Sequence, residues 1–221
     1  MKKGIIFDMD GTLWDSAEGV AKSWTVKLKE LHPEFGEITE QDIKSVMGLP
    51  MDKIADIFFG DLPEKEKNEL LDICGDYENE YLREHGGMLF PDLEQVLIEL
   101  KNDYHLYIVS NCQSGYIEAF LDYYDFWKYF EDIECFGNNE LPKGDNIAGI
   151  IRRNEVTKAV YVGDIQGDYD ATMSAKEQLK EEGISVDFIL ADYGFGEVDA
   201  EVSKIDSLRE LPQVAYKMLG D

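Results

Sequence analysis

The sequence predicts an α/β fold in which a doubly wound, mostly parallel sheet carries an inserted all-helical segment. Four short apolar runs, rich in β-branched or aromatic residues and followed by polar or turn residues, predict strands at residues 4–7, 106–109, 159–162 and 188–191. Apolar strands separated by helical stretches are typical of a parallel sheet covered by helices on both faces. Helical apolar spacing recurs between these runs, at 93–100 and 147–151, so strands and helices alternate as this fold class requires.

Residues 15–87 interrupt this alternation. They contain no convincing strand and several segments with helical features, such as 39–59 and the acidic stretch that follows Pro63. Proline and acidic residues both suit the first turn of a helix. We therefore expect an α/β catalytic core made from residues 1–14 and 88–221, with residues 15–87 forming a separate helical cap.

The composition excludes several classes of partner. The 221 residues allow one large domain, or one domain with a smaller insertion. Lys and Arg number 21 against 47 Asp and Glu, a net charge of −26, and this charge repels nucleic acids and anionic membranes. No apolar run approaches the roughly 20 residues that span a bilayer, and the apolar start is too short for a signal peptide. Three cysteines without a pairing pattern indicate a reducing compartment. We therefore expect a soluble cytoplasmic protein, of an oligomeric state that nothing in the sequence indicates.

Chemistry-bearing residues follow the first expected strand directly. Segment 8–13 reads DMDGTL, so Asp8 and Asp10 stand at the carboxyl end of that strand and Gly11 permits a tight turn. Ligands of open α/β sheets bind at this edge. Two carboxylates two residues apart can supply a nucleophile and a proton-transfer group, although such a pair alone also occurs where acids merely cap helices or face water.

Three further elements bring polar groups toward the same edge. The second expected strand ends at Ser110 and Asn111, which can donate hydrogen bonds to phosphoryl oxygens. Lys143 precedes an amphipathic helix, in a loop from which it could reach the site. The third expected strand is followed by Asp164 and Asp168, whose oxygens suit a hard cation such as Mg²⁺.

The order and spacing of these four elements resemble the haloacid dehalogenase superfamily, in its phosphatase branch with a helical cap inserted after the first motif. The resemblance extends over nearly the whole chain. It implies a Mg²⁺-dependent phosphatase that hydrolyses a small phosphorylated metabolite, with Asp8 as the nucleophile and Asp10 as the general acid and base. The residues that it implies for phosphate binding are Thr12, Ser110, Asn111 and Lys143. Those that it implies for metal binding are Asp8, Asp10 through its carbonyl, Asp164 and, as an outer ligand, Asp168.

The charges support these roles independently of the resemblance. A phosphomonoester dianion with the carboxylates of Asp8 and Asp164 carries a formal charge of −4, and Mg²⁺ with Lys143 supplies +3 against it. Other chemistries lack their motifs, since no cysteine is followed by an arginine six positions later and no Walker loop is present. Segment 194–196 reads GFG, which we interpret as a loop near the site rather than a dinucleotide fingerprint.

Two alternatives stay open at this point. A sugar phosphomutase of the same superfamily usually carries a histidine early in the first cap helix, where this chain has Val20, and a basic residue in the cap loop, which here is the apolar segment 47–51. A non-enzymatic, receiver-like module that holds phosphate on Asp8 would not need Asp10 as a proton donor. Hydrolysis therefore remains the favoured activity.

Overall fold

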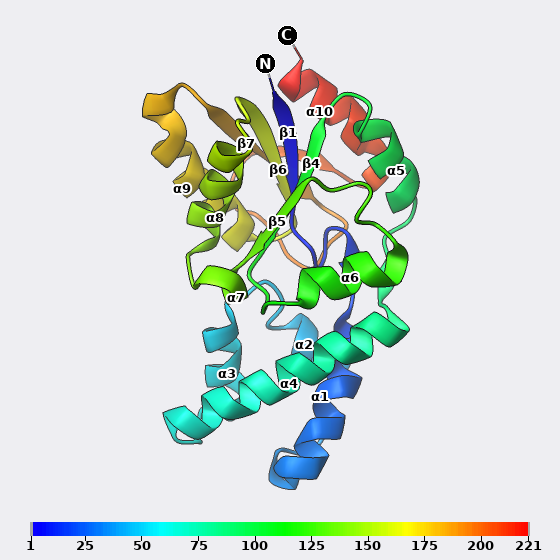
Figure 1. Ribbon diagram of the computed structural model, residues 1–221, viewed down its shortest axis with the longest axis vertical. Coiled ribbons are helices and arrows are strands. Elements are labelled where there is room, and N and C mark those ends of the chain that lie inside the picture. Colours follow the sequence, from blue (N-terminus) through cyan, green and yellow to red (C-terminus); the bar gives the residue numbers. More distant parts are fainter. Residues whose placement is uncertain (1, 221) are drawn as a thin grey trace.

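The central feature of the computed structural model, which describes residues 2–220, is a sheet that contains six parallel strands within that range (Figure 1). The order across the sheet is β5-β4-β1-β6-β7-β8, so the chain winds outward from β1 in both directions. The strands are β1 (Lys3–Phe7), β4 (His105–Ser110), β5 (Asp132–Cys135), β6 (Lys158–Gly163), β7 (Ser185–Ala191) and β8 (Ser203–Ile205). This arrangement confirms the predicted doubly wound α/β fold and brings the carboxyl ends of β1, β4 and β6 to one edge.

Helices cover both faces of the sheet. Figure 1 shows α8 and α9 on one side and α5 and α10 on the other. Their bounds are α5 (Leu93–Leu100), α8 (Lys143–Arg153), α9 (Gln166–Leu179) and α10 (Leu211–Leu219). Alternate residues of a strand point to opposite faces. Accordingly, Ile5 and Phe7 of β1 belong to one apolar core, whereas Ile6 belongs to the other.

Each strand predicted from an apolar run is present, but two strands of the sheet were missed. β5 and β8 lie at its two edges, where one side of a strand has no neighbour. β5 alternates acidic and apolar residues, and its Asp132 and Glu134 form ion pairs with Arg153 at 2.6 Å. Edge strands can carry charged side chains and need not be continuously apolar. A prediction based on apolar runs therefore does not find them.

The predicted boundary near Phe188 was wrong, because β7 begins three residues earlier, at Ser185. The residues before it continue α9 into a short 3-10 helix, Lys180–Glu182. Gly183 then reverses the chain with a φ of 70°, a value that favours glycine. Ser185 and Asp187 are half-buried polar residues on either side of buried Val186. The first part of this strand is therefore not a continuous apolar run.

Helices occupy most of the chain between β1 and α5 and pack together below the sheet in Figure 1. They are α1 (Ala17–Leu31), α2 (Glu40–Lys44), α3 (Met51–Phe59) and α4 (Glu64–His85), with a 3-10 turn at Pro33–Phe35. Trp24 of α1 stacks on Phe59 of α3, with 5.8 Å between the ring centroids. The remaining helices are α6 (Tyr116–Tyr124), α7 (Phe136–Asn139) and the 3-10 turn Leu208–Glu210.

The chain passes between the sheet and these helices through a short antiparallel ribbon. β2 (Trp14–Asp15) leads into α1, and β3 (Met88–Leu89) returns from α4. Trp14 pairs with Leu89 and Asp15 with Met88, so the two crossings lie side by side. The helices α1 to α4 therefore leave the sheet and return to it at neighbouring positions.

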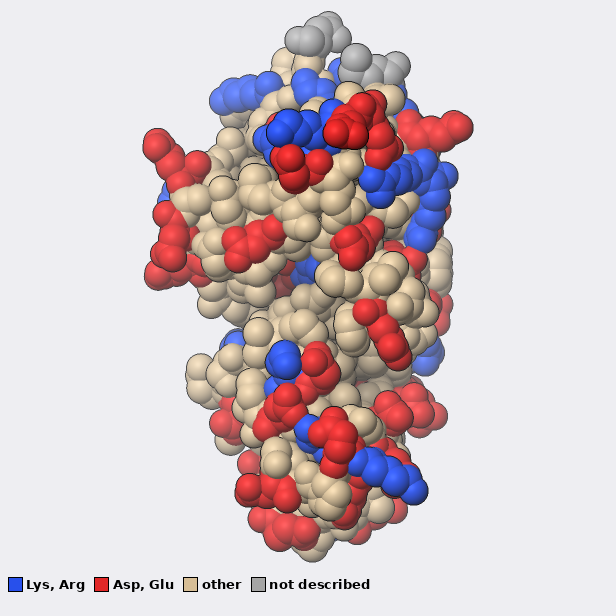
Figure 2. Space-filling view, turned by 90° about the vertical axis from the view of Figure 1, so that its left-hand side faces the viewer, with Lys and Arg blue, Asp and Glu red and all other residues tan. Residues whose placement is uncertain are grey.

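The surface carries acidic side chains on both parts of the molecule. Figure 2 shows them over the sheet-bearing upper part and over the helices below, with basic side chains most frequent near the top of that view. Among residues 2–220, no helix combines the length and the apolar character that crossing a membrane would require.

Candidate active site

A tight turn after β1 places the first predicted site residues. The Asp8 amide still donates to the Val162 carbonyl at 2.9 Å, which extends the pairing of β1 with β6 by one residue. The chain then turns through Gly11, whose φ is 82°. A Cβ on Gly11 would stand 2.0 Å from an Asp164 side-chain oxygen. Glycine is therefore required both by the backbone angle and by the close approach of Asp164.

Lys143 lies between two carboxylates at the bottom of the site. Its Nζ donates to Asp8 Oδ1 at 2.9 Å and to Asp168 Oδ1 at 2.6 Å, and all three side chains are almost completely buried. Burial lowers the pKa of Lys143, but Asp168 and Asp8 raise it further, so the net shift is upward. Lys143 is the first residue of α8 rather than a loop residue, so the helix fixes where its side chain starts.

Three carboxylates converge beside this lysine. Asp8, Asp164 and Asp168 each offer one oxygen within 4.8 Å of the others. Asp168 Oδ2 also accepts from the Asp164 amide at 3.1 Å, in the first turn of α9. Burial, then Asp168 and Asp8, raises the pKa of Asp164 to about 8. Three carboxylates against one ammonium leave a formal charge of −2, so the oxygen donors and the charge both fit a divalent cation such as Mg²⁺.

The carboxyl of Asp10 belongs to a separate hydrogen-bond network. Its Oδ1 accepts from Ser16 Oγ at 2.7 Å, and both of its oxygens accept from the Tyr116 hydroxyl, at 2.8 and 2.9 Å. Burial raises the pKa of Asp10 to about 7, although the bonds from Ser16 and Tyr116 lower it. Asp10 can therefore hold or release a proton near neutral pH.

Ser16 and Tyr116 were not identified from the sequence. Tyr116 begins α6 and is far from Asp10 along the chain, so only the packing of α6 against the turn after β1 brings the two together. Ser16 follows β2, and nothing in its immediate sequence marks it as a partner of Asp10. No local motif encodes either contact.

The predicted phosphate-binding residues occupy different positions. Ser110 ends β4 and lines a pocket together with Asp8 and Asp10. Asn111 lines it too, but its side-chain amide donates to the Gly48 carbonyl at 2.9 Å, on the loop between α2 and α3. Thr12 is fully buried and does not line the pocket, and within residues 2–220 its hydroxyl has no hydrogen-bond partner. The structure therefore brings Asp8, Asp10, Ser110 and Asn111 to one cavity and leaves the Thr12 hydroxyl outside it.

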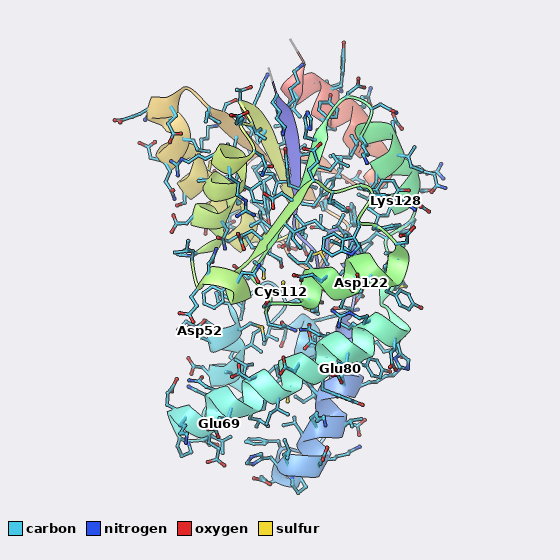
Figure 3. All side chains as sticks on the ribbon, viewed as in Figure 1. Asp52, Glu69, Glu80, Cys112, Asp122 and Lys128 are labelled. Atoms are coloured by element: carbon cyan, nitrogen blue, oxygen red, sulfur yellow. The ribbon has the colours of Figure 1, made fainter. Side chains whose placement is uncertain are left out.

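This pocket has a volume of about 50 Å³ and lies where the sheet edge faces the helices below it. Cys112, labelled in Figure 3, marks this junction and lines the pocket. The helical side of the pocket is largely apolar and is formed by Val20, Trp24, Ile43, Val46, Met47, Leu49, Met51 and Ile54. Glu78 of α4 adds a carboxyl group to that side.

The GFG segment, residues 194–196, lies beside the site. The Phe195 amide donates to Asp164 Oδ2 at 2.7 Å. A Cβ on Gly194 would stand 2.3 Å from the Asp164 Cβ, so this backbone packs directly against Asp164. The segment follows β7 as a loop, as predicted from the sequence.

Comparison with known proteins connects this geometry to an enzyme family. The sequence profile of the haloacid dehalogenase-like hydrolases matches residues 5–180. The chain is 26% identical to the phosphoglycolate phosphatase of Salmonella typhi, over 99% of this chain and 90% of that protein. It is also 26% identical to a Dickeya dadantii protein described as "probable phosphatase IndB", but that match covers 59% of this chain and 57% of that protein.

Solved structures show the same fold. A haloacid dehalogenase-like family hydrolase of Streptococcus pneumoniae superposes with a TM-score of 0.74 at 24% identity, covering 96% of this chain and 98% of that one. A Rhodobacter sphaeroides protein called CbbY, solved with xylulose 1,5-bisphosphate, superposes with a TM-score of 0.75 at 17% identity, covering 96% of each chain. These likenesses extend over the sheet and the helices below it.

Proposed function

Because the chain belongs to the haloacid dehalogenase-like hydrolases and is a phosphatase of that family, we propose that it hydrolyses a small phosphomonoester through a covalent phosphoryl group on Asp8, with Mg²⁺ bound. The observation that carries this proposal is the buried arrangement of Asp8, Lys143, Asp164 and Asp168 beside the separate network of Asp10. The first set can hold a phosphoryl group and a cation, and the second can move a proton.

The reaction proceeds in two steps. A carboxylate oxygen of Asp8 attacks the phosphorus, the bond from phosphorus to the alcohol oxygen breaks, and Asp10 gives its proton to the departing oxygen. Water then attacks the phosphorus of the phospho-Asp8 group and passes its proton to Asp10, and the bond from phosphorus to the Asp8 oxygen breaks to release inorganic phosphate. A pKa of about 7 lets Asp10 serve in both directions near neutral pH.

Other residues orient the phosphoryl group and offset its charge. Lys143 places its ammonium against the oxygen of Asp8 and adds positive charge where the phosphoryl oxygens become more negative. Ser110, at the end of β4, faces the same cavity and can donate its hydroxyl to a phosphoryl oxygen. Asn111 contributes indirectly, because its amide binds the loop that carries Gly48 and so ties the helices to the sheet edge.

The carboxylates of Asp8 and Asp164 would hold Mg²⁺, together with the Asp10 carbonyl. Asp168 would act from further out, since Lys143 and the Asp164 amide already occupy its oxygens. When bound, the ion supplies positive charge for phosphoryl transfer. The formal charge of −2 left by these side chains is what a divalent ion would balance.

We also propose that helices α1 to α4 act as a cap over the site. They supply the apolar side of the pocket, and the ribbon of β2 and β3 joins them to the sheet at a single place. Val20 and Leu49 lie in that apolar side, and among residues 2–220 the lining holds no basic group that could bind a sugar during reorientation. This composition favours hydrolysis over phosphomutase activity.

Turnover with p-nitrophenyl phosphate tests the proposal. We expect many equivalents of inorganic phosphate per protein with Mg²⁺, almost none after chelation, and poor recovery with Ca²⁺. Asp8→Asn should lower kcat/KM on the order of 10⁴-fold and abolish the phosphorylated protein that mass spectrometry detects after an acid quench. Asp170→Asn, at an exposed position of α9, is the matched control and should retain activity. Full activity in chelator, or an active Asp8→Asn, would contradict the proposal.

A further inference from the structure

Glu78 is a buried acid that the phosphatase chemistry does not use. It lies on α4, its residue is 4% exposed, and its carboxyl group faces the pocket from the side opposite the sheet. Gln113 Nε2 donates to its Oε1 at 3.0 Å, and Trp24 Nε1 donates to its Oε2. Both donors are neutral, so they hold the carboxyl group in place without cancelling its charge.

No cationic side chain compensates this charge inside the pocket. Among residues 2–220, the lining contains no lysine, arginine or histidine, whereas it contains Asp8, Asp10 and Glu78. Lys44 follows the lining residue Ile43, but its Nζ is 2.8 Å from Asp15 and 2.6 Å from Glu40. Lys143 forms ion pairs with Asp8 and Asp168 and does not line the pocket. The space for the alcohol part of a substrate is therefore apolar, with an uncompensated carboxyl group in its wall.

Burying an ionised carboxyl group without a cationic partner costs free energy, and a cationic ligand can offset that cost. In the absence of a cation, burial raises the pKa of Glu78 to about 7. A protonated amine beside Glu78 would stabilise the ionised carboxylate, and Trp24 offers an aromatic surface that also attracts cations. A second carboxylate would be repelled by Glu78 and would find no counter-ion in the lining.

We propose, on the basis of the phosphatase function above, that Glu78 selects phosphomonoesters of small amino alcohols and disfavours those whose alcohol carries a carboxylate. This assignment separates the chain from its relatives named phosphoglycolate phosphatase, whose named substrate is an anionic acid. The phosphate end of the substrate meets Asp8 and Lys143, and the ammonium end meets Glu78. The apolar side chains that line the same pocket would contact the carbon chain of the alcohol.

Three phosphate esters of similar size test this assignment. Phosphoethanolamine carries a cation, propyl phosphate is neutral in its alcohol, and 2-phosphoglycolate carries an anion. For the unmodified protein we expect kcat/KM to fall in that order, with phosphoethanolamine favoured over 2-phosphoglycolate on the order of 100-fold. Glu78→Gln, which keeps the shape and removes the charge, should reduce this ratio to less than about tenfold and change propyl phosphate little.

The matched control is Glu80→Gln, an exposed position of the same helix that Figure 3 labels, and it should leave the ratio unchanged. A ratio that favours 2-phosphoglycolate, or one that Glu78→Gln leaves unaltered, would overturn the assignment while leaving the phosphatase function intact. Absence of hydrolysis of all three esters and of p-nitrophenyl phosphate would instead overturn the proposed function, and the assignment with it. If Glu78→Gln fails to fold, the ranking of the three esters by the unmodified protein decides the question.

Discussion

Buried carboxyl groups have opposite kinds of partner at the sheet edge and on the helical side of the pocket. At the sheet edge, Asp8 and Asp168 are buried against the ammonium of Lys143. At the helical end, Glu78 is buried against neutral donors from Trp24 and Gln113. The charge of Asp8 and Asp168 is offset within the protein, whereas the charge of Glu78 is left for a ligand to offset. Under the proposals above, the ammonium partner therefore separates the carboxylates that hold the phosphoryl group from the one that meets the alcohol part of the substrate.

Removing the positive charge of Lys143 should change the stability of the protein most. Lys143→Met keeps an apolar stem and leaves Asp8 and Asp168 buried without their partner, so we expect the free energy of unfolding in metal-free buffer to fall by about 3 kcal/mol. Denaturant unfolding measures this change. The control is Lys22→Met, whose side chain is 57% exposed and pairs with the exposed Glu18. It should leave the unfolding midpoint unchanged, because exposed ion pairs contribute little. Equal losses of stability in the two variants would contradict the claim that Lys143 offsets the charge of buried Asp8 and Asp168.

The uncompensated carboxyl group of Glu78 should instead make the free energy of unfolding depend on pH. Burial raises the pKa of Glu78 from its ordinary value of 4.5 to about 7. The folded protein therefore binds the extra proton more tightly than the unfolded chain, and this stabilisation is full below pH 4.5 and lost as pH rises through 7. Between these limits we expect the wild type to lose about 3 kcal/mol of unfolding free energy relative to Glu78→Gln.

Denaturant titrations of both proteins at several pH values across this window provide the measurement. Glu80→Gln serves again as the control, since its side chain is exposed on the same helix. Parallel pH profiles for the wild type and Glu78→Gln would show that Glu78 is compensated in solution after all.

A smaller effect should distinguish Asp10 from Asp8. Asp10→Asn removes the proton that a departing alkoxide needs, but p-nitrophenolate leaves without one. We expect the variant to lose about ten- to a hundredfold more kcat/KM with propyl phosphate than with p-nitrophenyl phosphate. Equal losses on the two substrates would argue against a general-acid role for Asp10.

The sequence predicted the parts of the molecule that depend on short segments. The central strands show as apolar runs because both of their faces are buried. Asp8 and Asp164 directly follow β1 and β6, and Lys143 begins α8. Their convergence follows from the parallel topology, which brings the ends of β1 and β6 to one edge. The turn after β1 and the GFG loop were likewise visible in the sequence.

The contacts that depend on how helices pack could not be predicted in this way. Tyr116 reaches Asp10 only because α6 lies across the turn after β1. Glu78 is one of many acids on α4, and its burial is not evident from composition. One signal was available, since Cys74 and Leu82 stand four residues before and after Glu78 and share its buried face. An acid inside an apolar helical stripe therefore merits a search for its function.

The ribbon of β2 and β3 also bears on how this architecture diversifies. The helical segment leaves and rejoins the sheet at paired positions, Trp14 opposite Leu89, so its two ends are already held together. Lengthening, shortening or exchanging everything between them leaves the path of the chain through the sheet unchanged and requires no new loop closure. We therefore expect that the helices lining the apolar side of the pocket can be exchanged at this ribbon, provided that Ser16, a hydrogen-bond partner of Asp10, is kept.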